Sequence, residues 1–188
     1  STFNYDAVST NPVFTTATAT NNVYQVIDST LGLPAAIAPT AGDGRIAFYT
    51  SINTTVAPRF RINGFYNATT AAIPVYLPSE ITLIKAEANA RTGNLTAALT
   101  ELNKVITKTA AADPFKVGAN LTASTASTAD AILTEIYRNR CIELFMSGLK
   151  LEDMRRFGRA TTERKRNFFP YPFKERDGNP NTPADPSF

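Results

Sequence analysis

A charged side chain on an otherwise apolar helix face constrains this chain more than any other sequence feature. Residues 130–172 read DAILTEIYRNRCIELFMSGLKLEDMRRFGRATTERKRNFFPYP, which predicts a helix, a glycine break, a second short helix and another glycine break. At 100° per residue, Arg140 falls in the middle of one face of the first helix. The other positions on that face are Leu133, Ile136, Tyr137, Leu144 and Gly148.

A guanidinium in such a face keeps its proton, so it needs a carboxylate partner or contact with water. Glu143, one turn further on, and Asp153, beyond the first break, are the candidate partners of Arg140. We therefore expect a structural ion pair that holds two helices together, and a ligand-contacting role for Arg140 is the alternative.

The composition indicates one globular domain and excludes several kinds of site. The chain has 188 residues, of which 43% are hydrophobic and 19% charged, and a net charge of +3, values typical of a folded domain. It has no histidine and a single cysteine, Cys141, which excludes the usual zinc and copper sites and the Ser-His and Cys-His catalytic arrangements. We expect neither a metal nor a cofactor.

Two further patterns concern partners. Basic residues crowd positions 155–166, but no interleaved aromatic residues and no recognisable reading helix accompany them, so no nucleic-acid partner is expected. No apolar run approaches transmembrane length, and the amino terminus lacks the order of a signal peptide.

Residues 1–77 are rich in Thr, Ala, Asn and Pro and predict an irregular, loop-rich segment. Residues 22–27 and 46–52 are candidate extended segments, and residues 42–44 are a candidate turn. So long an irregular stretch is unusual in a compact domain. We expect it to wrap a helical core or to pair with a part of the protein that is absent from this chain.

Residues 78–109 predict a helical hairpin. Ser79 is the expected N-cap of its first helix, and Gly93 is the expected C-terminal cap. The second helix carries an apolar stripe at helical spacing, formed by Leu95, Ala98, Leu99, Leu102 and Ile106. Small residues at Ala86 and Ala98 match the tetratricopeptide layout, in which two short helices pack closely.

The remainder is predicted as a loop over residues 110–129, a second helical pair over 130–158, and an aromatic and proline-rich tail over 159–188. Ser127 and Asp130 form a candidate capping box before the second pair. The tail aromatics are expected to pin the tail onto the helices; they are Phe168, Phe169, Tyr171 and Phe173. The expected fold class is mainly α, with tetratricopeptide-like helical hairpins wrapped by long irregular loops and little β structure.

Three segments in this order resemble the SusD/RagB family, the surface nutrient-binding lipoproteins of Bacteroidota. LPSEITLIKAEANARTGN is similar to the family helix of the form SE–LI–AEA–R–GN. IYRNRCIELFMSGLKLEDMRRFG is similar to its I–ER–EL–EG–R–DL–RFG block, and FFPYPFKERDGNP to its closing segment. The order and spacing agree over residues 75–180. Four positions depart from the family pattern, and they are Asn139, Cys141, Ser147 and Lys150.

Two acidic residues of the family block are therefore lost, and its ion-pair network must be simpler in this chain. The members at matching positions are Glu87, Arg140, Glu143, Asp153 and Arg156. We predict that Arg140 pairs with Glu143, Asp153 or Glu87. Residues 43–45 resemble the corresponding family region only loosely.

The resemblance implies a binding protein at the outer-membrane surface that captures an oligosaccharide and delivers it to a SusC-like TonB-dependent transporter. Because family members are considerably longer, it also implies that this chain is the carboxyl-terminal part of such a protein. Its amino-terminal half, signal peptide and lipid anchor would then lie upstream.

The ligand-contacting residues cannot be read from the matched segments. Aromatic residues in loop-like sequence are the candidates for stacking on sugar rings, and they are Tyr49, Phe65, Tyr66 and Tyr76. An alternative function is a tetratricopeptide-type module that binds peptides or proteins. An enzyme is not expected, because the acidic residues available for a catalytic pair belong mostly to helix-packing motifs.

Overall fold

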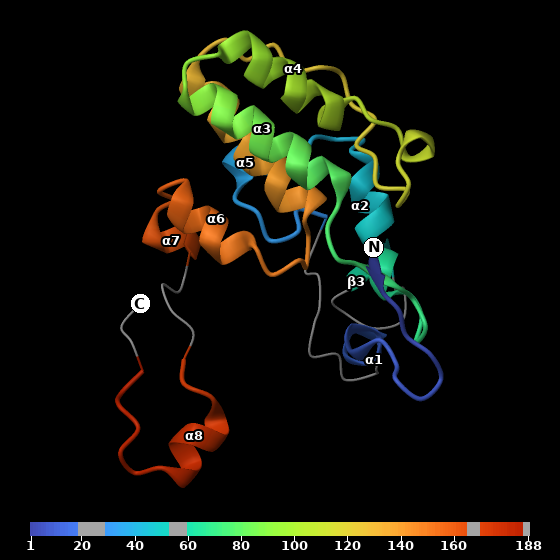
Figure 1. The fold of residues 1–188 in the computed structure, drawn as a ribbon, viewed down its shortest axis with the longest axis vertical. Coiled ribbons are helices and arrows are strands. Elements are labelled where there is room, and N and C mark those ends of the chain that lie inside the picture. Colours follow the sequence, from blue (N-terminus) through green and yellow to red (C-terminus); the bar gives the residue numbers. More distant parts are fainter. Residues whose placement is uncertain (19–28, 53–59, 165–169, 186–188) are drawn as a thin grey trace. The chain divides into compact units, whose positions relative to one another are not determined.

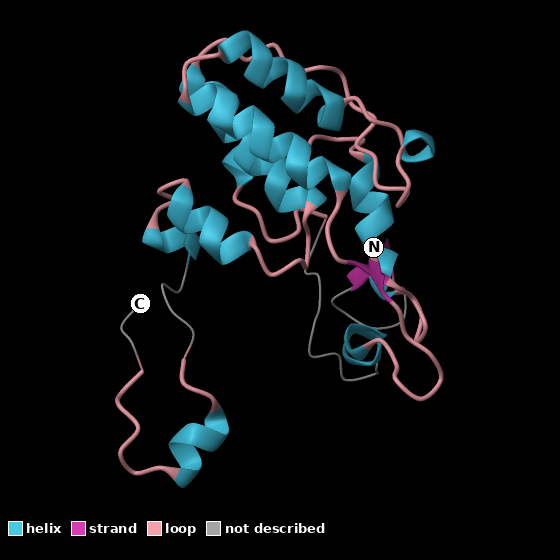
Figure 2. Cartoon of the chain, in the orientation of Figure 1, coloured by secondary structure: helices cyan, strands magenta, loops and turns pink. Residues whose placement is uncertain are grey.

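The computed structural model describes residues 1–18, 29–52, 60–164 and 170–185. It divides into two compact units, Ser1–Phe145 and Met146–Phe188. Helices predominate in both units and strands are few and short (Figure 2). The predicted mainly α fold with irregular loops and little β structure is confirmed.

Three helices form the centre of the first unit: α3 (Pro78–Arg91), α4 (Leu95–Ile106) and α5 (Ala129–Glu143). α3 packs against both α4 and α5, and α4 also packs against α5 (Figure 1). Their apolar core is fully or almost fully buried, and its members are Leu83, Ala86, Ala90, Ala98, Leu102, Val105, Ile106, Ile132, Ile136, Tyr137 and Ile142.

The hairpin of α3 and α4 was predicted correctly, except for its cap. α3 begins at Pro78, which occupies the first helical position, where its missing N–H costs nothing. Ser79 is therefore not the N-cap; its side chain is buried and accepts a hydrogen bond from Lys108. At the other end of α3, Gly93 is in the left-handed conformation at φ +83°, as expected for the predicted C-terminal cap. The Asn94 N–H bonds back to the Asn89 carbonyl, which closes a Schellman motif.

Both ends of α5 differ from the prediction. Thr128, rather than Ser127, is the N-cap, and its hydroxyl accepts from the Ala131 N–H. The helix ends at Glu143 instead of continuing to Gly148, and Met146 has a positive φ of 64°. The last five residues of α5 are all buried, so this end is enclosed on every side rather than along one apolar stripe.

The segment before α3 contains more regular structure than its sequence suggests. Its helical elements are α1 (Pro12–Thr18), η1 (Ala35–Ile37), α2 (Gly44–Tyr49) and η2 (Gly64–Tyr66). Its strands are β1 (Thr2–Phe3), β2 (Thr50–Ile52), β3 (Phe60–Ile62) and β4 (Ile73–Pro74). β1 pairs with β4 and β2 with β3, both antiparallel, with Thr2 opposite Pro74 and Thr50 opposite Ile62.

The extended segment predicted at residues 46–52 is thus only half correct. Its first part belongs to helix α2, because the Asp43 carboxylate accepts from the Arg45 N–H and caps the helix. Only Thr50–Ile52 is a strand. The segment predicted at residues 22–27 lies outside the described residues.

Close backbone approach ties the loop after α4, which includes η3 (Ala110–Ala112), to the start of α2. The Gly44 N–H donates to the Ala119 carbonyl at 2.9 Å, and a β-carbon on Gly44 would come within 2.6 Å of the Gly118 oxygen. A β-carbon on Gly118 would lie 2.3 Å from the Ala110 nitrogen. Both glycines are required by space rather than by an unusual φ.

The second unit contains three short helices, α6 (Lys150–Arg156), α7 (Thr161–Arg164) and α8 (Phe173–Gly178). The break predicted at Gly158 is confirmed, because the Arg159 N–H bonds back to the Met154 carbonyl at 2.9 Å. Phe168 and Phe169 lie outside the described residues, while Phe173 begins α8. The predicted role of these rings in holding the tail stays a prediction. No helix in the described ranges is long and apolar enough to span a bilayer.

Replacing Gly118 by alanine is expected to destabilise the protein by about 1–3 kcal/mol or more, because the new methyl group meets backbone atoms that cannot move independently. Urea unfolding followed by circular dichroism measures the change. Gly178→Ala is the matched control, since a β-carbon there meets nothing within 4 Å. Equal stability of the two variants would show that the loop does not approach this closely.

Candidate functional site

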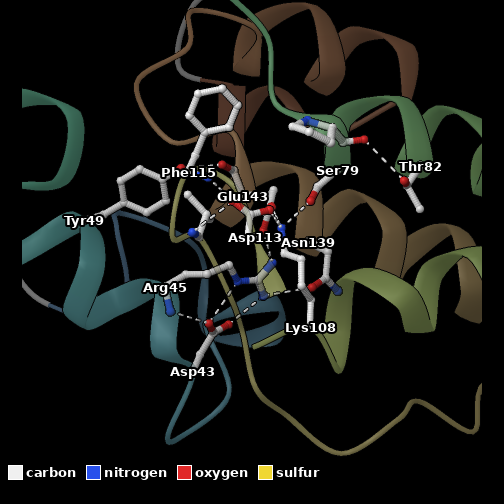
Figure 3. Close-up of polar contacts among 12 residues, drawn as sticks. Asp43, Arg45, Tyr49, Ser79, Thr82, Lys108, Asp113, Phe115, Asn139 and Glu143 are labelled. Atoms are coloured by element: carbon white, nitrogen blue, oxygen red, sulfur yellow. Dashed lines mark hydrogen bonds and ion pairs between the residues drawn. The ribbon is translucent and has the colours of Figure 1, made fainter. Parts of the chain in front are cut away.

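A buried ion network centres on Glu143, the last residue of α5 (Figure 3). The Glu143 side chain is 0% exposed. Its Oε2 accepts from Arg45 Nη1 at 3.2 Å, and its Oε1 accepts from Lys108 Nζ at 2.8 Å. One carboxylate therefore joins α2 and the segment after α4 to the end of α5.

The Arg45 guanidinium donates hydrogen bonds to three side chains, those of Asp43, Asn139 and Glu143. Its Nε and Nη2 donate to the two carboxylate oxygens of Asp43 at 2.9 and 2.6 Å, and Nη2 also donates to Asn139 Oδ1 at 2.9 Å. Burial alone would lower the pKa of this guanidinium. The hydrogen bonds and negative charges of Asp43 and Glu143 outweigh that effect, so the pKa of Arg45 is raised.

Lys108 completes the network from the opposite side. Its ammonium donates to Ser79 Oγ, Asp113 Oδ2 and Glu143 Oε1 at 2.5, 2.6 and 2.8 Å. Asp113 also accepts from the Phe115 and Val117 N–H groups at 2.8 and 3.3 Å, which orders the loop after η3. The network thus contains three carboxylates and two cations, and it fastens α3 and the loop to α5.

A polar groove lies between the extended segment at residues 121–126 and α5. It consists of one hollow of about 410 Å³ and a second, more open hollow of about 460 Å³. The two share Ser124, Thr125 and Glu135. The first is lined by Thr40, Ala41, Asp43, Arg45, Ile106, Leu121, Thr122, Ala123, Ser124, Thr125, Glu135, Arg138, Asn139 and Ile142. The second adds Ala126, Asp130, Ala131 and Thr134.

The residues predicted to form an ion-pair network are distributed over both units. Glu143 lies at the centre of the network just described, whereas Glu87 pairs with Arg91 at 2.8 Å within α3. In the second unit Asp153 pairs with Arg156 at 2.5 Å within α6. Arg140 is buried with 4% of its surface exposed. Its pairing with one of the three predicted carboxylates stays a prediction.

Most of the network's members were not among the residues singled out in the sequence. Asp43, Arg45, Lys108 and Asp113 gave no periodic signal, and beyond the loose family resemblance around Asp43 and Arg45 no motif marked them, because the carboxylate that joins them, Glu143, is distant in sequence. Arg45 is 98 positions from Glu143, and Lys108 is 35 positions from it. The one local signal was Asp43, a typical N-cap residue two positions before the arginine that it binds.

The four candidate stacking aromatics differ in exposure. Tyr49 is fully buried, and its hydroxyl donates to the Glu143 carbonyl at 2.6 Å. Tyr66 is also buried, with 4% of its surface exposed. The half-buried Phe65 packs edge-on against Tyr49 at 6.1 Å between ring centroids. Tyr76, with 51% of its surface exposed, presents the largest accessible fraction of the four.

Metal binding finds no support in the described part of the chain, where no group of three or more acidic, cysteine or histidine side chains is arranged to hold an ion. The Glu143 carboxylate pairs with Arg45 and Lys108, and the Asp113 carboxylate pairs with Lys108, so both act as structural carboxylates.

Comparison with known proteins bears out the resemblance seen in the sequence. The family model described as SusD family, SusD_RagB, matches residues 17–185. No curated protein and no solved structure matches the chain. The family match covers nearly the whole chain, including all the residues of the ion network and of the polar groove.

Replacing Glu143 by glutamine is expected to cost about 3–5 kcal/mol of unfolding free energy, because Arg45 and Lys108 would lose a buried partner. Urea unfolding measures the loss. Glu101→Gln is the matched control: its pair with Lys104 within α4 is exposed, and its loss is expected to cost about 0.5 kcal/mol or less. A Glu143→Gln protein as stable as the control variant would contradict a structural role for the network.

Stability is also expected to fall as the pH rises from 10 towards 12. Burial raises the pKa of Tyr66 to about 12, whereas the ordinary value is 10.0. Between these values the unfolded chain releases a proton that the folded chain retains, so alkali favours unfolding. One such group contributes at most about 1.4 kcal/mol per pH unit. Urea unfolding from pH 9 to 11.5 should show a shallower decline for Tyr66→Phe; an identical decline would contradict this role of Tyr66.

Proposed function

The chain belongs to the SusD family, and from this membership we propose that it is a cell-surface protein which binds oligosaccharides and delivers them to a SusC-like TonB-dependent transporter. The family match over residues 17–185 is the observation that carries the proposal. SusD family proteins are binding proteins rather than enzymes. Membership implies a glycan-binding role, and the specific glycan belongs to the proposal.

The architecture of the first unit is consistent with binding by a rigid scaffold. The buried ion network fixes α3, α5 and the loop after α4 relative to one another through Lys108 and Glu143. A scaffold of this kind loses little conformational entropy when it receives a ligand. The polar groove and the half-exposed ring of Tyr76 are two accessible features of this unit that support contact with a sugar.

Location and partner follow from the same membership. A SusD-like protein is expected at the outer-membrane surface as a lipoprotein, paired with its transporter. The proposed ligand is therefore a nutrient oligosaccharide that is captured outside the cell and released into the transporter.

Isothermal titration calorimetry of the full chain tests the proposed ligand class. Panels of neutral and acidic oligosaccharides and of mixed-sequence peptides are titrated under identical conditions. Saturable binding of at least one oligosaccharide is the expected result. Binding of peptides without any oligosaccharide would contradict the proposal and favour the tetratricopeptide-type module instead.

A further inference from the structure

One wall of the polar groove is an extended segment that is fastened to α4. The Leu121 N–H donates to the Ile106 carbonyl at 3.0 Å. The Asn103 side chain then bonds Ser124 twice, because Asn103 Oδ1 accepts from the Ser124 N–H at 2.7 Å and Asn103 Nδ2 donates to the Ser124 carbonyl at 3.1 Å. These bonds occupy backbone groups of Leu121 and Ser124, while Thr122 and Thr125 remain exposed as lining residues.

The opposite wall is one face of α5. Glu135 and Arg138 form an ion pair one turn apart, and their side chains are 23% and 24% exposed. Asn139 lies beside them; it donates to the Glu135 carbonyl at 2.9 Å and accepts from Arg45. This wall therefore presents a carboxylate that accepts hydrogen bonds and a guanidinium that donates them, both in contact with solvent.

The charges that line the first hollow are balanced. Two carboxylates, Asp43 and Glu135, face two guanidinium groups, Arg45 and Arg138. Asp43 and Arg45, which are buried, already bond each other through two side-chain hydrogen bonds. No lining residue among those described is aromatic. Across both hollows the groove thus offers hydroxyl, guanidinium and carboxylate groups, with Asp130 of the second hollow as the one carboxylate in excess, and its described lining residues supply no ring on which a sugar face could stack.

We infer that the polar groove is a subsite for a neutral oligosaccharide segment, held by hydrogen bonds to Glu135, Arg138 and the hydroxyl groups of Thr122, Ser124 and Thr125. This inference rests on the proposed glycan-binding function. Both hollows fall within the size range of small-ligand sites. Neutral polyols use both donors and acceptors, which the groove supplies, whereas an acidic sugar would meet three carboxylates against two guanidinium groups.

Two properties follow from hydrogen bonding without stacking. Discrimination between saccharides should depend on the configuration of their individual hydroxyl groups. A site built to bond a hydroxyl is left with unpaired polar groups when that hydroxyl is misplaced. Binding of a neutral ligand should also be insensitive to ionic strength, since no net charge is screened.

Backbone amide NMR of the full chain tests this site directly. The probes are hexasaccharides of glucose, mannose, galactose and xylose, together with a hexamer of galacturonate, each at low and high salt. The expected result is that a neutral hexasaccharide shifts amides at residues 122–125 and 135–139, equally at both salt concentrations.

A matched pair of variants tests whether the saccharide binds in the groove. Ala123→Trp fills the groove from an exposed lining position, whereas Ala97→Trp places the same side chain on the exposed surface of α4 outside it. Affinity should fall at least about tenfold in Ala123→Trp, a change of about 1.4 kcal/mol, and stay unchanged in Ala97→Trp.

The other outcomes separate this inference from the proposed function. Saccharide binding that shifts amides elsewhere and survives Ala123→Trp would overturn the groove as the site while leaving a glycan-binding protein. Salt-sensitive binding of galacturonate alone would overturn the neutral ligand class. Absence of binding by every saccharide in this panel and in the calorimetric panels would overturn both the subsite and the proposed function.

Discussion

The first unit depends on one buried carboxylate that is shared by two cations. Glu143 ends α5, and it accepts from Arg45 on one side and from Lys108 on the other. A buried charge without a partner would cost several kcal/mol, so α2 and the segment after α4 must both reach α5 for the fold to be stable. Lys108 extends the same requirement to α3 through Ser79 and to the following loop through Asp113.

The ion network and the polar groove share residues, which links stability to the proposed binding site. Asp43, Arg45 and Asn139 belong to the network and also line the first hollow of the groove. Because their hydrogen-bonding capacity is used inside the protein, they hold the base of the groove in place and leave Glu135 and Arg138 as the solvent-accessible charged groups of the first hollow. Such an arrangement suits recognition by a preorganised surface.

Local sequence signals predicted the elements well wherever the controlling interaction was itself local. The hairpin of α3 and α4 follows from an apolar stripe and a glycine in the left-handed conformation, both of which act within a few residues. The predicted cap at Ser79 was wrong because Pro78 can occupy the first helical turn and because Lys108 takes the serine hydroxyl. The strand expected from residue 46 became helix α2 because Asp43 caps it.

The sequence by itself determined the helical character of the chain, the hairpin and the family, since these depend on periodicity and on ordered motifs along the chain. The tertiary structure decided which cations Glu143 binds and where the groove lies. Ion pairing has no period, and a carboxylate 98 residues from its arginine carries no mark of that partner in the sequence. Only the packing of α2, α4 and α5 brings such groups within hydrogen-bonding distance, and the same packing creates the groove.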